Sequence, residues 1–125
     1  MKKHESAEDY LETILMLQEK QGYVRSIDIA NELNYSKPSV SIAMKKLREE
    51  DCIEMTAEGY ITLLPKGLKI AADIYERHQL LSKVFVQLGV DPETAVEDAC
   101  RVEHDLSEIT YQKLKEHVRR KEQDL

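Results

Sequence analysis

The chain has 125 residues, of which 42% are hydrophobic, so it can form one compact unit or two small ones and is not expected to be disordered throughout. No apolar run has the length of a membrane span, and the first residues lead directly into an amphipathic segment rather than a signal sequence. We therefore expect a cytoplasmic protein with no membrane partner. The two cysteines, Cys52 and Cys100, lie far apart, which argues against a disulfide framework.

The formal net charge of −6 argues at first against nucleic-acid binding, because Lys and Arg must neutralise the phosphates. The charge is unevenly distributed, however. Residues 22–48 hold five basic and two acidic residues, whereas residues 91–108 hold seven acidic residues and one arginine. This asymmetry predicts a phosphate-facing surface in the first half and either a solvated acidic face or a cation site in the second.

The first half predicts three helices. Residues 5–21 carry apolar side chains at helical spacing. Ser26 opens a short second helix that Asn34 can end, because asparagine tolerates the left-handed conformation. A cap at Ser36 and an early proline, Pro38, begin a third helix. Its predicted buried stripe consists of Val40, Ala43, Met44 and Leu47.

The rest of the chain predicts a hairpin and further helices. Residues 53–56 and 60–63 are β-prone runs on either side of a turn with glycine. A long helix follows from Pro65 to a glycine cap near residue 89, then a helix over residues 91–104 and another that Ser107 can cap. The predicted fold is therefore mainly α with a small β-hairpin wing.

The order of helix, short helix, turn, helix and hairpin is typical of a winged helix-turn-helix, in which the second helix of the pair enters the major groove. Its exposed face would offer hydroxyls and lysines to phosphates and base edges. The alternative is that Ser36 only caps the helix and that the lysines are ordinary solvated charges. The order of elements favours contact with double-stranded DNA, through Ser36, Lys37, Pro38, Ser39, Ser41, Ile42, Lys45 and Lys46.

The acidic segment places Cys100, Glu103 and His104 at positions i, i+3 and i+4, so one helix face would present a thiolate, a carboxylate and an imidazole. All three are metal ligands, and a cation would also explain the acidity. Alternatively, each is a structural or solvated residue. Cys52 has no ligand-spaced neighbour and is expected to pack. With donors on the first and the long helices, the candidate metal ligands are Asp9, Glu12, His78, Cys100, Glu103 and His104.

Three segments carry a family resemblance: Ser6-Ala-Glu-Asp-Tyr-Leu-Glu12, Arg77-His78 and Asp98-Ala-Cys-Arg-Val-Glu-His104. They resemble the iron- and manganese-dependent transcriptional repressors of the diphtheria toxin repressor family, over nearly the whole chain. The resemblance implies a winged helix-turn-helix DNA-binding domain over residues 1–64 and a helical metal-binding and dimerisation domain over residues 65–125. It also implies a homodimer that binds operator DNA when metal is bound and controls metal-homeostasis genes. No enzymatic activity and no small-molecule substrate are expected.

The chain combines features of two branches of that family. Its length and Asp9 resemble the shorter, manganese-responsive branch, whereas Cys100 and its neighbours resemble the iron-responsive branch. The resulting hybrid ligand set favours Fe²⁺, with Mn²⁺ a close second, because a thiolate favours iron over manganese. Two other functions compete: a metal-independent winged-helix regulator, and a metal-dependent hydrolase, for which we find no nucleophile or general base outside the ligands.

Overall fold

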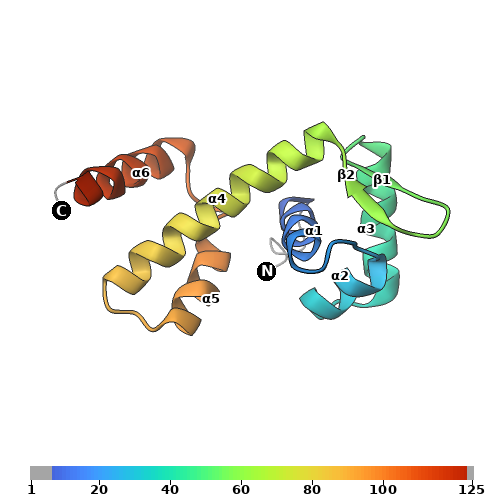
Figure 1. The fold of residues 1–125 in the computed structure, drawn as a ribbon, viewed down its shortest axis with the longest axis horizontal. Coiled ribbons are helices and arrows are strands. Elements are labelled where there is room, and N and C mark those ends of the chain that lie inside the picture. Colours follow the sequence, from blue (N-terminus) through green and yellow to red (C-terminus); the bar gives the residue numbers. More distant parts are fainter. Residues whose placement is uncertain (1–6, 124–125) are drawn as a thin grey trace. The chain divides into compact units, whose positions relative to one another are not determined.

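The computed structural model describes residues 7–123, and its contacts divide the chain into a first unit that ends at Asp73 and a second that begins at Ile74. The order of elements confirms the predicted fold, mainly helical with one small hairpin (Figure 1). Helix α4 (Pro65–Gln87) contributes residues to both units. Over residues 7–123, no helix combines the length and the apolar character needed to cross a membrane.

The first unit is built around α1 (Ala7–Gln21), which contacts α2 (Ser26–Leu33), α3 (Lys37–Glu49) and the second strand of the hairpin. The apolar residues that recur at helical spacing along these helices turn inward and form one core. Within this unit α2 and α3 pack against each other. The core's largest fully buried side chains include those of Leu11, Ile14, Val24, Ile29, Val40 and Met44.

Local side-chain chemistry sets the ends of these helices. The predicted cap at Ser36 is confirmed, since its Oγ accepts a hydrogen bond from the backbone N–H of Ser39 at 3.3 Å. Arg25 is the N-cap residue of α2, and its backbone N–H donates to the Asp28 carboxylate at 2.9 Å. Asn34 ends α2 with φ at +59°, the left-handed conformation that its residue type predicts.

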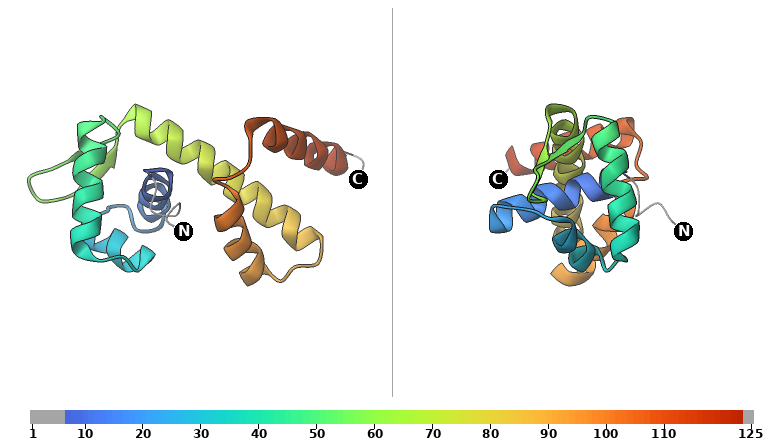
Figure 2. Two further views of the ribbon diagram at one scale, coloured as in Figure 1. Left: turned by 180° about the vertical axis from the view of Figure 1, so that it is seen from behind. Right: turned by 90° about the vertical axis from the view of Figure 1, so that its right-hand side faces the viewer.

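The hairpin pairs β1 (Ile53–Met55) with β2 (Ile61–Leu63) in antiparallel register, as predicted, with each strand one residue shorter at the turn. Gly59 has φ at +92°, a conformation that favours glycine. The backbone N–H of Ile61 also donates to the carbonyl of Val24 at 2.8 Å, so the segment before α2 anchors the wing. In Figure 2 the hairpin loop projects beyond α3.

The second unit consists of the later part of α4 with α5 (Pro92–Val102) and α6 (Glu108–Gln123). Asp91 caps α5 and Ser107 caps the start of α6, as predicted. The expectation that α5 continues through residue 104 was wrong. The chain leaves the helix after Val102, and a side chain of α4 satisfies the carbonyl of the next residue, as described below.

Candidate functional site

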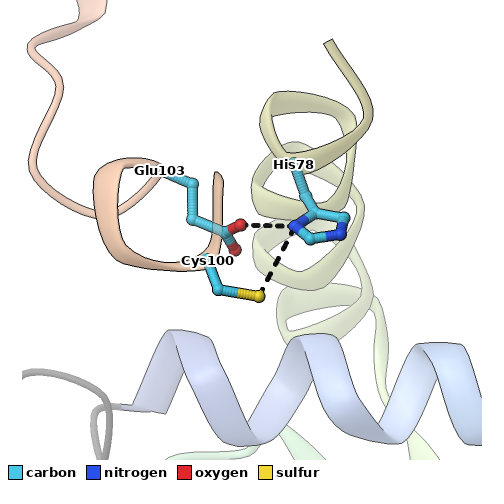
Figure 3. A group of neighbouring side chains, drawn as sticks. All are labelled: His78, Cys100 and Glu103. Carbon is cyan, nitrogen blue, oxygen red and sulfur yellow. Dashed lines mark hydrogen bonds and ion pairs between the residues drawn. The ribbon is translucent and has the colours of Figure 1, made fainter. Parts of the chain in front are cut away.

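A cluster of three donor side chains lies in the second unit, where the end of α5 meets α4. The carboxylate Oε1 of Glu103 lies 2.7 Å from Nδ1 of His78, and the Sγ of Cys100 lies 3.8 Å from the same nitrogen. One donor atom from each residue lies within 4.8 Å of the other two. Figure 3 shows the three side chains pointing toward one another from the two helices. Cys100 and Glu103, which follow His78 by 22 and 25 positions along the chain, are thus brought close to it.

Burial differs among the three donors. Glu103 has no exposed surface and His78 is 8% exposed, whereas Cys100 is exposed. A buried carboxylate is costly unless it is paired, and here it lies within hydrogen-bonding distance of the His78 imidazole. Two ligands of one transition-metal ion lie about 3 Å apart, because each metal–nitrogen or metal–oxygen bond is about 2 Å. The donor set, its spacing and its access through Cys100 therefore fit a divalent transition metal.

The remaining predicted ligands are divided between the two units. His104 lies in the turn after α5, with its Nε2 3.6 Å from Oε2 of Glu103. Asp9 and Glu12 belong to the first unit, where they lie about one helical turn apart on α1. Of the six predicted ligands, the second unit thus brings together three closely and a fourth beside Glu103.

A second polar network surrounds the turn after α5, and sequence reasoning missed it. The guanidinium of Arg77 donates to the backbone carbonyls of Glu103 at 3.2 Å and of Leu106 at 2.8 Å, and it pairs with Glu108 at 2.9 Å. Hydrogen bonds from Gln112 and Arg77 hold the pKa of Glu108 below its ordinary value. The only sequence signal was that Arg77 adjoins His78, and adjacency does not indicate where a long side chain reaches.

The same network continues along α4 and α6. The hydroxyl of Tyr111 and the ammonium of Lys115 both donate to the carboxylate of Glu76, and these two hydrogen bonds hold its pKa below the ordinary value. Burial is the main cause that raises the pKa of Tyr111, and the hydrogen bond to Glu76 raises it further. The Arg77 guanidinium also lies over the Tyr111 ring, 4.8 Å from its centroid. These contacts fix the part of α4 that carries His78.

The predicted DNA-contacting residues lie in the first unit, at the start of α3 and along its outer face. All eight are exposed, and Ile42, an apolar residue, is 72% exposed. The predicted inward stripe is buried, with Ala43 half-buried. The hydroxyl of Ser36 also donates to that of Ser39 at 2.9 Å. The element order therefore presents a face of hydroxyls and lysines to solvent.

A hollow of about 220 Å³ lies beside this face, between the starts of α2 and α3. Lys37 and Ser41, which line it, belong to the predicted DNA-contacting set. Ser26 and Ile27 line it from α2, and sequence reasoning did not assign them to the surface. Ile27 has an apolar side chain at helical spacing, so periodicity alone indicates burial, but it is 40% exposed.

Cys52 lies in a tight junction between the wing and α4. It is buried, and its carbonyl accepts a hydrogen bond from the backbone N–H of Leu64 at 2.9 Å. A Cβ on Gly67 would lie 2.1 Å from that carbonyl oxygen, so only glycine allows this approach. Among residues 7–123, Cys52 belongs to no group of donors that could hold a metal ion. It packs, as its sequence context predicted.

Comparison with known proteins matches both halves of the chain to family models. Residues 3–63 match the model described as iron dependent repressor, N-terminal DNA binding domain. Residues 64–124 match the model described as iron dependent repressor, metal binding and dimerisation domain. Together the two models account for almost every residue.

Similar curated proteins are transcriptional regulators. The transcriptional regulator MntR of Escherichia coli is 37% identical over 108 residues, which cover 86% of this chain and 70% of the relative. The HTH-type transcriptional regulator MntR of Bacillus pumilus is 38% identical over 102 residues, covering 82% of this chain and 71% of the relative.

Solved structures show the same fold. The IdeR of T. acidophilum superposes with a TM-score of 0.82 at 27% identity, covering 90% of this chain and 54% of that one. A structure described as the manganese regulator SloR superposes with a TM-score of 0.78 at 28% identity, covering 91% and 54%. The chain thus spans about half the length of these structures.

Proposed function

Because this chain belongs to the iron-dependent repressor family of transcriptional regulators, we propose that it is a metal-activated repressor that binds double-stranded operator DNA as a homodimer. On this proposal it acts in the cytoplasm on metal-homeostasis genes and is not an enzyme. Residues 1–64 form the DNA-binding domain and residues 65–125 form the metal-binding and dimerisation domain.

The observation that carries the proposal is the convergence of His78, Cys100 and Glu103 on one another. An imidazole, a thiol and a carboxylate together form a ligand set for a divalent transition metal. Asp9, Glu12 and His104 join the proposed set because of their donor chemistry and their spacing along the chain. Binding a cation requires loss of the Cys100 proton, whereas a neutral His78 imidazole can bind through a ring-nitrogen lone pair, so binding should release the thiol proton.

The DNA-contacting role is assigned to the exposed face of α3 and the hollow beside it. The lysines of that face can neutralise phosphates, and its hydroxyls can bond phosphates or base edges. The proposal adds Ser26 and Ile27, which line the hollow together with two members of the predicted set. The assigned residues are Ser26, Ile27, Ser36, Lys37, Pro38, Ser39, Ser41, Ile42, Lys45 and Lys46.

Metal binding and DNA binding should be coupled, because the proposed ligands belong to both units. Two ligands come from α1, which packs against the DNA-contacting helix pair, and four come from the second unit. If occupied ligands favour the conformation that binds DNA, DNA must in turn raise the affinity for the cation by the same factor. This reciprocity distinguishes the proposal from a metal-independent winged-helix regulator.

The preferred cation depends on Cys100. The relative SloR is described as a manganese regulator, which moves the expectation toward Mn²⁺. The thiol moves it toward iron, cobalt or zinc, because soft sulfur ligands disfavour manganese. We propose Fe²⁺ as the preferred cation and Mn²⁺ as the second, with Cys100 as the residue that sets this order.

Anaerobic binding of operator DNA, titrated in turn with Fe²⁺, Mn²⁺, Co²⁺ and Zn²⁺, tests the proposal. Cys100→Glu should move the preference toward Mn²⁺, while Cys52→Ala, a change at the other cysteine, should leave the ranking unaltered. DNA affinity that does not change on chelation would overturn metal activation. An unaltered ranking in Cys100→Glu would overturn only the role of Cys100, and sedimentation velocity with and without metal would test the homodimer.

A further inference from the structure

Arg77 connects three segments that meet at the donor cluster. It lies on α4 next to His78, and its guanidinium reaches the turn after α5 and the first residue of α6. Nη1 donates to two backbone carbonyls, those of Glu103 and Leu106, and Nη2 pairs with Glu108. The side chain is only 15% exposed, so water does not compete freely for these bonds. One rigid, planar group therefore fixes the turn to the helix of His78.

The consequence for the cluster follows from where Glu103 lies. Glu103 caps the C-terminal end of α5, where the carbonyls have no partner within the helix. Its side chain faces His78 at 2.7 Å while its own carbonyl accepts from the residue next to His78. The imidazole and the carboxylate are thus held by the same short stretch of α4. Without Arg77, the turn of residues 103–107 would lose two of the bonds that orient it.

We propose that Arg77 is a positioning residue for the metal site, which holds the backbone of Glu103 so that its carboxylate stays directed at His78. The inference rests on the proposed function, since it concerns the affinity of that same site for a cation. Arg77 does not itself offer a ligand atom, because a guanidinium has no acceptor.

Charge alone predicts the opposite effect. A guanidinium close to a cation site repels the cation, so removing the charge should strengthen binding. Loss of positioning should instead weaken binding, by about tenfold, as is typical when a partner that orients a metal ligand is lost. The sign of the change in affinity therefore separates the two effects.

The experiment compares Arg77→Met with Arg101→Met. Arg101 lies on α5 beside Cys100, is 67% exposed and pairs only with Asp98 among the residues described, so its removal changes charge but not positioning. Affinity for Mn²⁺ and for Co²⁺ is measured by competition with a chelating dye at a temperature at which circular dichroism shows both variants folded. We expect Arg77→Met to bind about tenfold more weakly than wild type, and Arg101→Met to bind as tightly or more tightly.

A second readout uses the metal-free protein. Backbone amides of residues 104–107 should exchange faster with solvent in Arg77→Met than in wild type, with no change in Arg101→Met. If Arg77→Met does not fold, Arg77→Lys serves instead. It retains the charge, but a single ammonium cannot reproduce the planar fork, so binding should weaken by a smaller factor.

The outcomes separate the two proposals. If the wild type binds neither cation, the proposed function fails and this inference fails with it. If the wild type binds but the Arg77 variants bind as tightly, the inference alone is overturned. Weaker binding in the Arg77 variants, together with faster exchange confined to the turn, would establish the positioning role.

Discussion

The two units expose their proposed functional side chains to different degrees. In the first unit the DNA-contacting residues lie in solvent on the outer face of α3, whose opposite face packs into an apolar core. In the second unit Glu103 and His78 are buried and only Cys100 is exposed. An exposed charge adds little to stability, whereas a buried one must be compensated. Apart from the helix cap at Ser36, changes at the first surface should therefore alter binding alone, and changes at the cluster should alter binding and stability together.

The largest effect is expected from Glu103→Gln. The isosteric amide can still form a hydrogen bond with His78, but the substitution removes a charged metal ligand. Affinity for Mn²⁺ should therefore fall at least about 100-fold, which exceeds the loss typical when a residue that only orients a ligand is removed. At a free Mn²⁺ concentration of about 100 times the wild-type Kd, the cation should stabilise the wild type by about 2.7 kcal/mol and the variant hardly at all. Thermal unfolding with and without Mn²⁺ measures this.

Glu93→Gln is the matched control, because Glu93 is an exposed acid in the first turn of the same helix. It should retain the full stabilisation by Mn²⁺. An equal gain in the unfolding temperature of wild type and Glu103→Gln would contradict the assignment of Glu103 as a ligand.

The next effect tests the exposed surface. Replacing Lys45 and Lys46 together with alanine should weaken binding to operator DNA and lower the dependence of log Kd on log salt by about 2, because two phosphate contacts are lost. Both side chains are exposed, so the free energy of unfolding should change by less than about 0.5 kcal/mol. Fluorescence anisotropy over a series of salt concentrations gives the slope.

The double change Lys113→Ala with Lys121→Ala removes the same charge from exposed positions of α6 and serves as the control. If it lowers the salt slope as much as the α3 change, the effect comes from net charge rather than from contacts on α3. DNA binding could then not be assigned to the exposed surface of the first unit rather than to the second unit.

The two units also differ in how much of their structure the sequence could predict. Ser36, Asn34 and Gly59 act within a few residues of themselves, so caps and turns of the first unit were predictable from residue type. The face that α3 exposes followed from periodicity. These are local properties of the chain.

The donor cluster depends instead on contacts across 22 to 25 positions. Spacing pairs Cys100 with Glu103, but no local pattern brings His78 to them; donor chemistry made His78 a candidate, and the family resemblance supported the set. Neither spacing nor the resemblance predicted the contacts of Arg77 with the turn, because two of its partners are backbone carbonyls, which every residue has. The end of α5 at Val102 was missed for the same reason, since the carbonyl of its C-cap residue, Glu103, accepts a hydrogen bond from Arg77 of α4.

Ser36 offers a smaller and sharper test, because its hydroxyl caps α3 and also lies on the proposed DNA surface. Ser36→Ala should cost about 1 kcal/mol of stability through the lost cap. Ser36→Asp should keep the cap, because aspartate is an equally good N-cap residue, yet it should weaken DNA binding by repelling phosphates. Chemical denaturation and DNA titration of both variants separate the two roles. Unweakened DNA binding by Ser36→Asp would remove Ser36 from the contact set.

The smallest effect concerns the corresponding cap of the second unit. The backbone N–H of Thr94 bonds the Asp91 carboxylate and holds its pKa below the ordinary value. A lowered folded pKa gives stability that is complete above the unfolded pKa, about 3.9, and is lost as the pH falls through the folded value. Asp91→Asn keeps a neutral cap, so its unfolding temperature should lie slightly below that of wild type at pH 6 and meet it in acid.

The Ser36 cap should behave differently, because a hydroxyl does not titrate in this range. The gap in unfolding temperature between wild type and Ser36→Ala should therefore stay constant from pH 6 to the acid limit of folding. If the Asp91 gap is equally constant, its origin is not the carboxylate charge. The start of α5 would then be held by the neutral hydrogen bond alone, as the start of α3 is, and the two units would differ in the burial of their functional groups but not in how their helices begin.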